Sequence, residues 1–470
     1  MDFIITVVTF ILVIGFLILI HEGGHFFAAR WAGVWVHEFA IGFGPAFWKR
    51  KTKETLYALR YFPVGGYVRM AGETVTATEG GNHAETDTDA PKSDDPNKAV
   101  KQEDPQFEED ALVPEDRMFS AKSPWARMWI IFAGPLTNIV GAILIMIFVT
   151  AAFGAPQIEI IDFTSDDSPA AQALEAGDII ATIEGETIYS TGQITSAIVN
   201  KGENPLKFGI VRNGEPMEVT VTPEWSPEGD RFLIGARFSI AQTNLITNLQ
   251  DGAYLAKQGV QKGDRIVAIN DMAVASSSTL NIAIDQLRES DSDTATMTIQ
   301  RNGTPQTITL DLANNTVEHI FTGVGLEVPT RAFGFIESIS VGTSQTWGMA
   351  VALYNGIRTV IRGEIAAGEA FSGPVGIANI LSDGLERGWT QFFFLVAFLS
   401  LNLGIFNLLP IPALDGSRIV FITIELIMGR PVPPRWEGLI HQGGFFFLIA
   451  LILLITFNDI WKIVQGFFGG

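Results

Sequence analysis

The sequence has no cysteine among its 470 residues. Disulfide bonds and thiolate metal ligands are therefore excluded, and any metal must be held by histidine or carboxylate side chains. Charged residues are also scarce, at 17% of the chain, and 31 Lys and Arg stand against 51 Asp and Glu. The resulting net charge of −20 argues against nucleic acid as a partner, because phosphate backbones demand a basic surface.

Long uncharged runs occupy much of the chain instead. Four stretches approach or exceed the ~20 apolar residues that a bilayer span requires, at 3–20, 128–153, 388–414 and 438–458. The first is not a convincing signal peptide, because Asp2 replaces the usual basic segment and no small-x-small cleavage site follows. The sequence therefore predicts four membrane spans, the first of them retained.

Basic residues near the span ends predict the orientation. They follow the first span, precede the second and separate the third from the fourth: Arg30, Lys49, Arg50, Lys51, Lys53, Arg60, Arg117, Lys122, Arg127, Arg418, Arg430 and Arg435. Cytoplasmic loops carry the excess of Lys and Arg, so both termini and residues 153–387 are expected outside the cytoplasm.

Composition divides the chain further. We expect the first span and a β region at 1–72, an acidic insertion at 73–116, the second span at 117–154, two β-rich domains at 155–235 and 236–330, an amphipathic region at 331–387, and the last two spans at 388–470. The acidic insertion holds 14 Asp and Glu against three Lys. Such a segment cannot bury enough apolar surface to fold alone, which predicts a flexible cytoplasmic insertion.

One helical face is predicted in the amphipathic region. Apolar residues recur there every three or four positions, at Trp347, Val351, Tyr354, Ile357 and Ile361. Such a helix would lie at the membrane surface or pack on the preceding domain.

The two β-rich domains are copies of one repeat. Gly177-Asp178 in the first copy is matched by Gly263-Asp264, 86 residues later. Downstream in each copy, an Asn-Gly pair separates two alternating apolar strands, which is a strong hairpin signal. The repeats resemble PDZ domains, specifically the circularly permuted kind of bacterial proteases. That resemblance implies peptide binding along a sheet edge, and spacers or size filters with empty grooves are the alternative.

The first span ends in a motif that carries chemistry. His21 and His25 are four residues apart, which places both imidazoles on one face of a helix, where they can bind one zinc ion. Glu22 lies beside that metal rather than on it, in position to take a proton from water. Ionisable residues at membrane depth are expensive and usually functional. The motif therefore predicts a zinc peptidase, and the alternative is polar side chains tolerated at the end of a span.

A third zinc ligand is less obvious from the residues alone. His441, at the start of the fourth apolar stretch, is one candidate, whereas Glu38 or Glu54 would suit a soluble zinc protease. Asp415 is the most distinctive remaining polar residue, although a Leu-Asp-Gly sequence by itself is usually only a turn or a helix cap.

The two motifs together resemble the site-2 protease family of intramembrane zinc metalloproteases. They are His21-Glu22-x-x-His25 in the first span and Asn407-x-x-Pro410-x-Pro412-x-Leu414-Asp415-Gly416 at the third. The resemblance implies that Asp415 is the third zinc ligand and that Asn407 handles the substrate backbone. Pro410 and Pro412 would break the helix where irregular backbone lines a cavity.

Other segments extend the resemblance. Residues 62–73 are similar to the family's membrane-associated β-hairpin, 132–138 to its second-span signature, and 371–378 to its segment before the third span. In the hairpin, a strand is expected to pair with the unwound substrate, at Gly65, Gly66, Tyr67 and Val68.

Gly23 departs from the family, which commonly has a bulkier residue there. The insertion at 73–116 is also longer than the family leads us to expect.

The predicted fold class is a membrane protein. It combines a four-span α-helical metalloprotease core, a membrane-associated β-hairpin and two tandem extracytoplasmic PDZ domains. The resemblance implies Zn²⁺ and cleavage of transmembrane segments in the bacterial inner membrane. The implied substrates are an anti-sigma factor after a first external cut, in an envelope stress response, and remnant signal peptides. We expect a monomer in the lipid bilayer. A catalytically silent PDZ scaffold and a metal transporter are the alternatives.

Overall fold

The computed structural model describes residues 3–73, 112–227, 231–250, 252–290, 292–363 and 372–468. Most of the acidic insertion predicted at 73–116 lies outside these residues, so its flexibility stays a prediction. The chain forms two compact units. One contains Met1–Ile145, Ala350–Leu385 and Phe392–Gly470, and the other contains Met146–Met349 and Glu386–Gln391.

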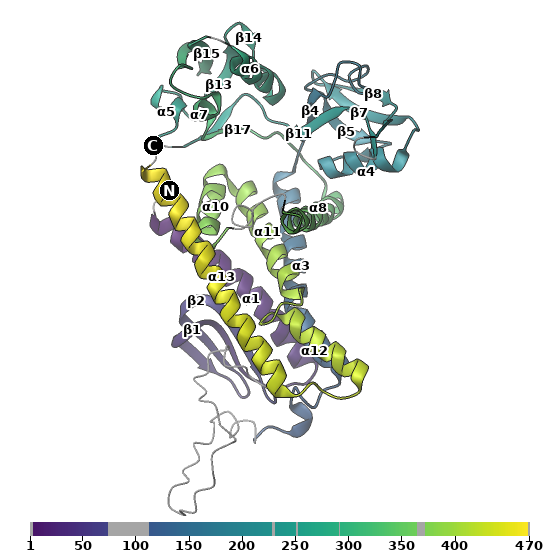
Figure 1. Ribbon diagram of the computed structural model, residues 1–470, viewed down its shortest axis with the longest axis vertical. Helices are drawn as coiled ribbons and strands as arrows, with labels where there is room; N and C mark the ends of the chain where they lie inside the picture. Colours follow the sequence, from purple (N-terminus) through teal and green to yellow (C-terminus); the bar gives the residue numbers. More distant parts are fainter. Residues whose placement is uncertain are drawn as a thin grey trace, which may run out of the picture. The chain divides into compact units, whose positions relative to one another are not determined.

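Four helices of the described residues are long and apolar enough to cross a membrane (Figure 1). They are α1 (Phe3–Trp31), α3 (Pro124–Phe153), α11 (Trp389–Leu408) and α13 (Pro434–Phe468). The four predicted spans are thus confirmed by length and composition. All four differ in extent from the predicted stretches. α1 runs on past the predicted end at residue 20, through the His-Glu motif, and α11 stops at Leu408 because Pro410 and Pro412 cannot donate helical hydrogen bonds.

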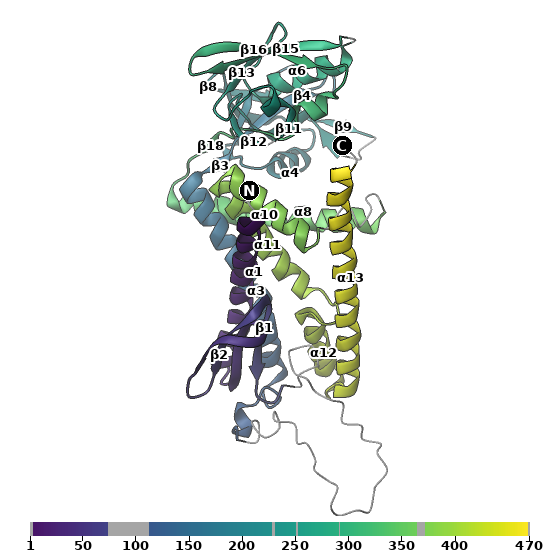
Figure 2. The same ribbon diagram turned by 90° about the vertical axis from the view of Figure 1, so that its left-hand side faces the viewer.

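A twisted β-hairpin follows α1. Its strands are β1 (Val36–Lys51) and β2 (Leu56–Met70), and the hairpin is longer than the region predicted at 62–73. Residues 36–41 pair with 66–70 and also with 56–59, while 46–51 pair with 56–60. Both views place the hairpin beside α1 (Figures 1 and 2). Among the described pairings, residues 66–70 pair only with 36–41, so they form an edge of this small sheet.

The described residues also form other helical elements outside the two β-rich domains. They are the 3-10 turn η1 (Glu115–Arg117), α8 (Phe335–Ile361), α10 (Pro374–Arg387) and α12 (Asp415–Met428). In α8 the predicted apolar stripe is largely exposed, since Trp347, Tyr354 and Ile361 are 72%, 66% and 80% accessible. The buried residues of α8 include Val341 and Gly342. An exposed apolar stripe suits a helix at the membrane surface.

The first β-rich domain contains nine elements. They are β4 (Ile158–Phe163), β5 (Ile179–Ile183), β6 (Glu186–Thr187), α4 (Thr191–Lys201), β7 (Leu206–Arg212), β8 (Glu215–Val221), β9 (Glu224–Ser226), β10 (Arg231–Leu233) and β11 (Ala236–Ile240). Its main sheet has the order β11-β4-β5-β7-β8, and β6 pairs with β5. Apolar side chains from this sheet and from α4 form one buried cluster, which includes Ile160, Ile194 and Phe208.

The second β-rich domain repeats this plan. Its elements are β12 (Ile246–Leu249), α5 (Tyr254–Lys257), β13 (Arg265–Ile269), β14 (Met272–Ala273), α6 (Ser277–Glu289), β15 (Thr294–Arg301), β16 (Thr304–Asp311), α7 (Val317–Phe321) and β17 (Val324–Leu326). Two short strands, β3 (Ala155–Pro156) and β18 (Thr330–Arg331), pair with each other. The order β5-β6-α4-β7-β8 recurs as β13-β14-α6-β15-β16, which confirms the predicted repeat.

Both Asn-Gly pairs turn a hairpin, as predicted. Asn213 and Gly214 have positive φ between β7 and β8, and Asn302 and Gly303 have positive φ between β15 and β16. Positive φ at both central positions is what a tight two-residue hairpin requires. The boundary predicted at 235/236 is wrong, however. β11 lies beyond it and pairs with β4, so the first sheet is completed by a strand that sequence periodicity assigns to the next domain.

The aspartates of the two Gly-Asp pairs form equivalent buried ion pairs. The Asp178 side chain is 1% exposed and accepts two hydrogen bonds from Arg212, at 2.8 and 2.7 Å. The Asp264 side chain is equally buried and accepts two from Arg301, both at 2.7 Å. The preceding glycines, Gly177 and Gly263, have φ of 94° and 96°. The same clamp thus ties the loop before the second strand to the hairpin in both domains.

We expect Arg301→Ala to loosen the second domain. The Asp264 carboxylate would stay buried without its guanidinium partner, and uncompensated buried charges are strongly destabilising. Amide hydrogen exchange in β13 and β15 of the full chain should then speed up by about tenfold or more. Arg265→Ala is the matched control, because Arg265 is exposed and its side chain donates a hydrogen bond to the neutral Asn244. Equal exchange in the two variants would refute the clamp.

Acid should weaken the same clamp. Burial disfavours the charged carboxylate of Asp264, but hydrogen bonds from Arg301 and the Gln261 amide outweigh burial and lower the pKa of Asp264. A lowered pKa contributes stability above the unfolded value of about 4, and that stability is lost as the pH falls further. The protection factors of the β13 amides in the wild type should fall below about pH 4, and Arg301→Ala should blunt that fall.

Candidate active site

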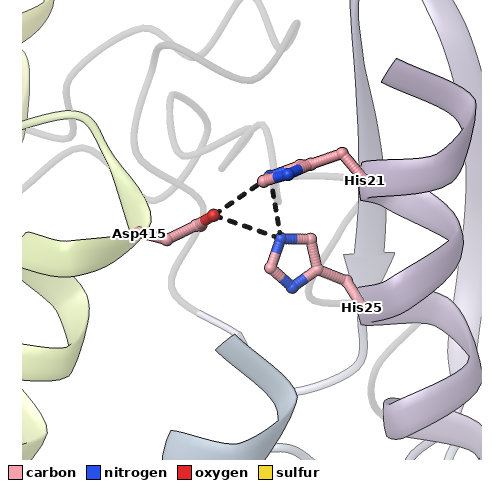
Figure 3. A group of neighbouring side chains, drawn as sticks. All are labelled: His21, His25 and Asp415. Atoms are coloured by element: carbon pink, nitrogen blue, oxygen red, sulfur yellow. Dashed lines mark hydrogen bonds and ion pairs between the residues drawn. The ribbon is translucent and has the colours of Figure 1, made fainter. Parts of the chain in front are cut away.

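Three side chains from two distant parts of the chain converge in the helical unit. His21 and His25 come from α1, and Asp415 opens α12, 390 residues after His25 (Figure 3). Asp415 Oδ2 lies 3.0 Å from His21 Nε2 and 3.4 Å from His25 Nε2, and the two Nε2 atoms are 3.3 Å apart. Both histidines are buried. Within the described residues, this is the group of His and carboxylate side chains that could hold a metal ion.

The spacing of these atoms fits a tetrahedral metal. Zinc binds histidine nitrogen and carboxylate oxygen at about 2.0–2.2 Å, so two ligands of a tetrahedron lie roughly 3.3–3.6 Å apart. The three separations here fall at or just below that length. Asp415 Oδ2 is moreover a buried oxygen with no hydrogen-bond donor. The donor set therefore suits a zinc ion with three protein ligands and one open position.

The other nitrogen of His25 is fixed by α3. His25 Nδ1 lies 2.9 Å from the Ile130 carbonyl, which can only accept a hydrogen bond. Nδ1 must therefore carry the proton, which leaves the Nε2 lone pair facing His21 and Asp415. Pro135 stands inside α3 and lacks the N–H that would bond to the Ile131 carbonyl, so the helix is loosened next to this contact.

His21 is held by a residue that sequence reasoning did not single out. The Asn138 side-chain amide lies 3.2 Å from His21 Nδ1, and Asn138 is fully buried in α3. With its oxygen turned toward Nδ1, the amide would accept the Nδ1 proton and leave the Nε2 lone pair for a metal. In the sequence, Asn138 is the last residue of the second-span signature at 132–138. The signal for a role was its isolation, since it is a side-chain amide within an apolar span.

Two glycines let α1 and α3 approach. A Cβ added to Gly24 would lie less than 3.0 Å from the Ala133 carbonyl oxygen and Thr137 Oγ1, and one added to Gly134 would collide with the His25 ring. Gly23 differs, because the nearest atom to an added Cβ is Phe27 Cε2 at 3.9 Å. The adjacent glycines are thus unequal, and only Gly24 is required by packing.

This difference predicts opposite results for two alanine substitutions. Gly24→Ala should separate α1 from α3, destabilise the protein by about 1–3 kcal/mol and displace His25, which weakens metal retention. Gly23→Ala adds the same methyl group one residue earlier, where there is room, and should retain metal as the wild type does. Thermal unfolding and metal analysis of the purified variants provide the measurement. Normal metal content in Gly24→Ala would contradict the packing argument.

The loop before α12 aims Asp415. α11 ends at Leu408, and Ala413 has a φ of 73°, which is unusual for a residue with a side chain. His441 of α13 is buried, and its Nδ1 accepts a hydrogen bond from the Ala413 amide at 3.2 Å. A Cβ on Gly416 would lie less than 3.0 Å from the carbonyl oxygens of Leu408 and Leu409. His441, considered above as a possible ligand, thus holds the loop and lies outside the ligand group.

A cavity of about 350 Å³ opens over this group. Most of the predicted site residues line it: His21, Glu22, His25, Gly65, Gly66, Tyr67, Val68, Asn407 and Asp415. Burial and the nearby Glu38 carboxylate raise the pKa of Tyr67 to about 12, so its hydroxyl stays protonated. Pro410 and Pro412 are not among the residues that line it, and Pro412 packs instead against Gly444 of α13.

Two further residues of the cavity wall were not anticipated. The Glu73 and Arg418 side chains form an ion pair and line the cavity, with Arg418 one helical turn after Asp415. The remaining sequence candidates lie elsewhere: Glu54 pairs with Arg30 and Arg117, and Glu38 pairs with Arg60. The Glu54 pKa is lowered chiefly by the Arg117 hydrogen bonds. Neither glutamate belongs to the ligand group.

Known proteins resemble this chain over nearly its full length. Residues 9–451 match the model of Peptidase family M50, and the chain belongs to that family. The protein is therefore a peptidase of the membrane-embedded class that its fold and site define, and the resemblance to site-2 proteases is confirmed.

Its relatives carry consistent names. The chain is 28% identical to "Regulator of sigma-W protease RasP" of Bacillus subtilis, covering 98% of this chain and 99% of that protein. It is 27% identical to "Zinc metalloprotease RasP" of Oceanobacillus iheyensis, covering 97% and 99%. It is also 28% identical to "Protease RseP" of Yersinia pestis, covering 96% and 97%. Neither the family nor these names favour a silent scaffold or a transporter.

Proposed function

We propose that the protein is a zinc endopeptidase that cleaves transmembrane segments of other proteins within the bacterial cytoplasmic membrane. The observation that carries this proposal is the convergence of His21, His25 and Asp415 at tetrahedral ligand spacing beside Glu22. The names of the zinc metalloprotease relatives support the metal. His21, His25 and Asp415 would hold it, and a bound zinc ion would supply Lewis-acid chemistry at its open position.

Glu22 is the proposed general base. It lines the cavity next to the two histidines, one residue from the first of them. A carboxylate there can take a proton from the attacking water and pass it to the leaving amine of the cleaved peptide bond. Asn407, on the cavity wall at the end of α11, is positioned to hydrogen-bond the substrate backbone.

The edge of β2 would hold the substrate as a strand. A transmembrane helix hides its carbonyls in internal hydrogen bonds, so the scissile bond must be unwound, and its freed groups need partners at membrane depth. Residues 66–70 offer such an edge, and Gly66, Tyr67 and Val68 line the cavity. A Cβ on Gly66 would lie 2.9 Å from Glu22 Cγ, so the strand passes directly over the proposed base. Strand addition here would bring the peptide to Glu22.

Chain order and the names of the relatives support a proposal for the substrate class. The two β-rich domains stand between the second and third membrane helices along the chain, outside the cytoplasm in the predicted topology. We propose that they exclude substrates with large external parts, so that a first external cut must come before cleavage. The Bacillus subtilis relative is named a regulator of sigma-W protease. We therefore propose an anti-sigma factor or a remnant signal peptide as the substrate of this chain.

A reporter with one transmembrane segment tests both parts of the proposal. Purified protein in lipid should cut a reporter with a short external tail, stop after chelation, and recover with added zinc. A reporter that carries a folded external domain should resist the wild type but be cut by a chain lacking residues 158–326. Zinc-independent cleavage would refute the metallopeptidase. Continued resistance after the deletion would refute only the exclusion.

A further inference from the structure

Two apolar cavities next to the β-hairpin take no part in the proposed reaction. They enclose about 330 and 430 Å³, and neither is lined by a residue of the catalytic cavity. Leu19, Phe39 and Tyr57 line both, so the two cavities form one groove between α1 and the hairpin. The second cavity reaches Thr137 of α3. The groove adjoins the C-terminal part of α1, between Leu19 and Phe27, and α1 is long and apolar enough to cross a membrane.

The groove has a cationic end. Trp48, Arg50 and Thr52 line the first cavity. Trp48 and Arg50 lie two residues apart on one face of β1, and Thr52 follows directly after that strand. Arg50 is exposed and forms no ion pair with the part of the chain that the structure describes. In contrast, Arg60 of the same hairpin pairs with Glu38. Arg50 is thus the charged group that the groove presents.

The surroundings of Arg50 are also basic. Lys49, Lys51 and Lys53 flank it, are exposed, and have no ion pair among the described residues. Four cations within five residues stand out in a chain with a net charge of −20. The nearest acidic residue in sequence, Glu54, is already occupied by Arg30 and Arg117. The local field therefore attracts an anion that the rest of the protein repels.

Gly23 keeps the inner end of the groove open. It lines the second cavity, and a Cβ there would meet no atom closer than 3.9 Å. A larger side chain at this position would project into the cavity. The position at which this sequence departs from the family pattern is thus the one that leaves space for an apolar ligand.

We propose that this groove binds an anionic phospholipid, with an acyl chain in the two apolar cavities and the phosphate on Arg50. An acyl chain suits a lining of leucine, isoleucine and aromatic side chains, and a guanidinium can bind phosphate oxygens with two parallel hydrogen bonds. Anionic headgroups are abundant on the cytoplasmic leaflet, where this hairpin is predicted to lie. The bound lipid would brace Phe39 and Ile41, whose segment pairs with the β2 edge.

Native mass spectrometry of the full chain with added lipid tests the site. Wild type should retain one phosphatidylglycerol in preference to phosphatidylcholine with the same acyl chains. Arg50→Gln should bind phosphatidylglycerol roughly tenfold more weakly, because one charge-assisted contact is lost. Lys53→Gln is the matched control: it removes one positive charge from a side chain that lines neither cavity, and it should bind as the wild type does.

A second variant tests the apolar part of the groove. Gly23→Leu should reduce retention of phosphatidylglycerol while leaving every charge in place, and unchanged metal content would show that the variant is folded. Equal retention of the two lipids by the wild type, or equal weakening by Arg50→Gln and Lys53→Gln, would reduce the effect to general surface charge and overturn the site. Displacement of the lipid by a reporter transmembrane segment would assign the groove to substrate and would also overturn it.

Discussion

Replacing Glu22 with glutamine is expected to slow cleavage by at least about 100-fold while leaving the metal bound. Glutamine keeps the size and position of the side chain beside His21 and His25 but cannot accept a proton. Loss of a general base costs roughly 10²- to 10⁴-fold in rate, so turnover of a transmembrane reporter should fall by that factor. Metal content by elemental analysis should stay at the wild-type level, since Glu22 is not in the ligand group.

A comparison with Asn407→Ala sharpens this test. Asn407 also lines the cavity, but it is proposed to bind the substrate backbone rather than to move a proton. Its loss should raise KM or lower turnover moderately, without changing the pH dependence of the reaction. Glu22→Gln should instead remove the acidic limb of the pH-rate profile. Undiminished cleavage by Glu22→Gln would take the base assignment away from Glu22 altogether.

The second large effect is expected at Asp415. Asp415→Ala removes one of the three proposed protein ligands, whereas changes to residues that only support ligands already cost 10- to 100-fold in metal affinity. We therefore expect affinity to fall by more than about 100-fold, and cleavage to fall with it. Dialysis against a graded chelator series, followed by metal analysis, measures the loss.

His441 provides the discriminating control for Asp415. His441 is buried, and its Nδ1 accepts a hydrogen bond from the amide of Ala413, which is two residues before Asp415. If it acts only through the loop, His441→Gln should retain most of the metal, because a glutamine oxygen can accept the same hydrogen bond. Metal loss in His441→Gln combined with full metal in Asp415→Ala would exchange the assignments and make His441 the ligand.

Local patterns in the sequence predicted the parts of the site that depend on one element. The four-residue spacing of His21 and His25 needs only a helix, and the structure supplies it in α1. The Asn-Gly hairpins and the four spans were predictable for the same reason, since each depends on a few neighbouring residues. Asp415 was different, because a lone Leu-Asp-Gly carries little information and its assignment came from a family resemblance.

Features that depend on contacts between elements could not be predicted. Asn138 acquires its position only because α3 packs on α1, and the unequal roles of Gly23 and Gly24 follow from the approach of Ala133 and Thr137. The domain boundary at 235/236 failed similarly, because β11 completes a sheet whose other strands precede it. Hydrophobic periodicity reports which face of a segment is buried, but not against which partner.

The division of the ligands between α1 and α12 has a consequence for biosynthesis. The two proposed histidine ligands are translated first, and the proposed third ligand, Asp415, emerges 390 residues after His25. A nascent chain that ends before Asp415 carries an incomplete site, and so does one whose α11–α12 loop has not docked on α1. If the proposed ligands are correct, such incomplete chains cannot hold the metal and therefore cannot cleave other proteins during insertion into the membrane.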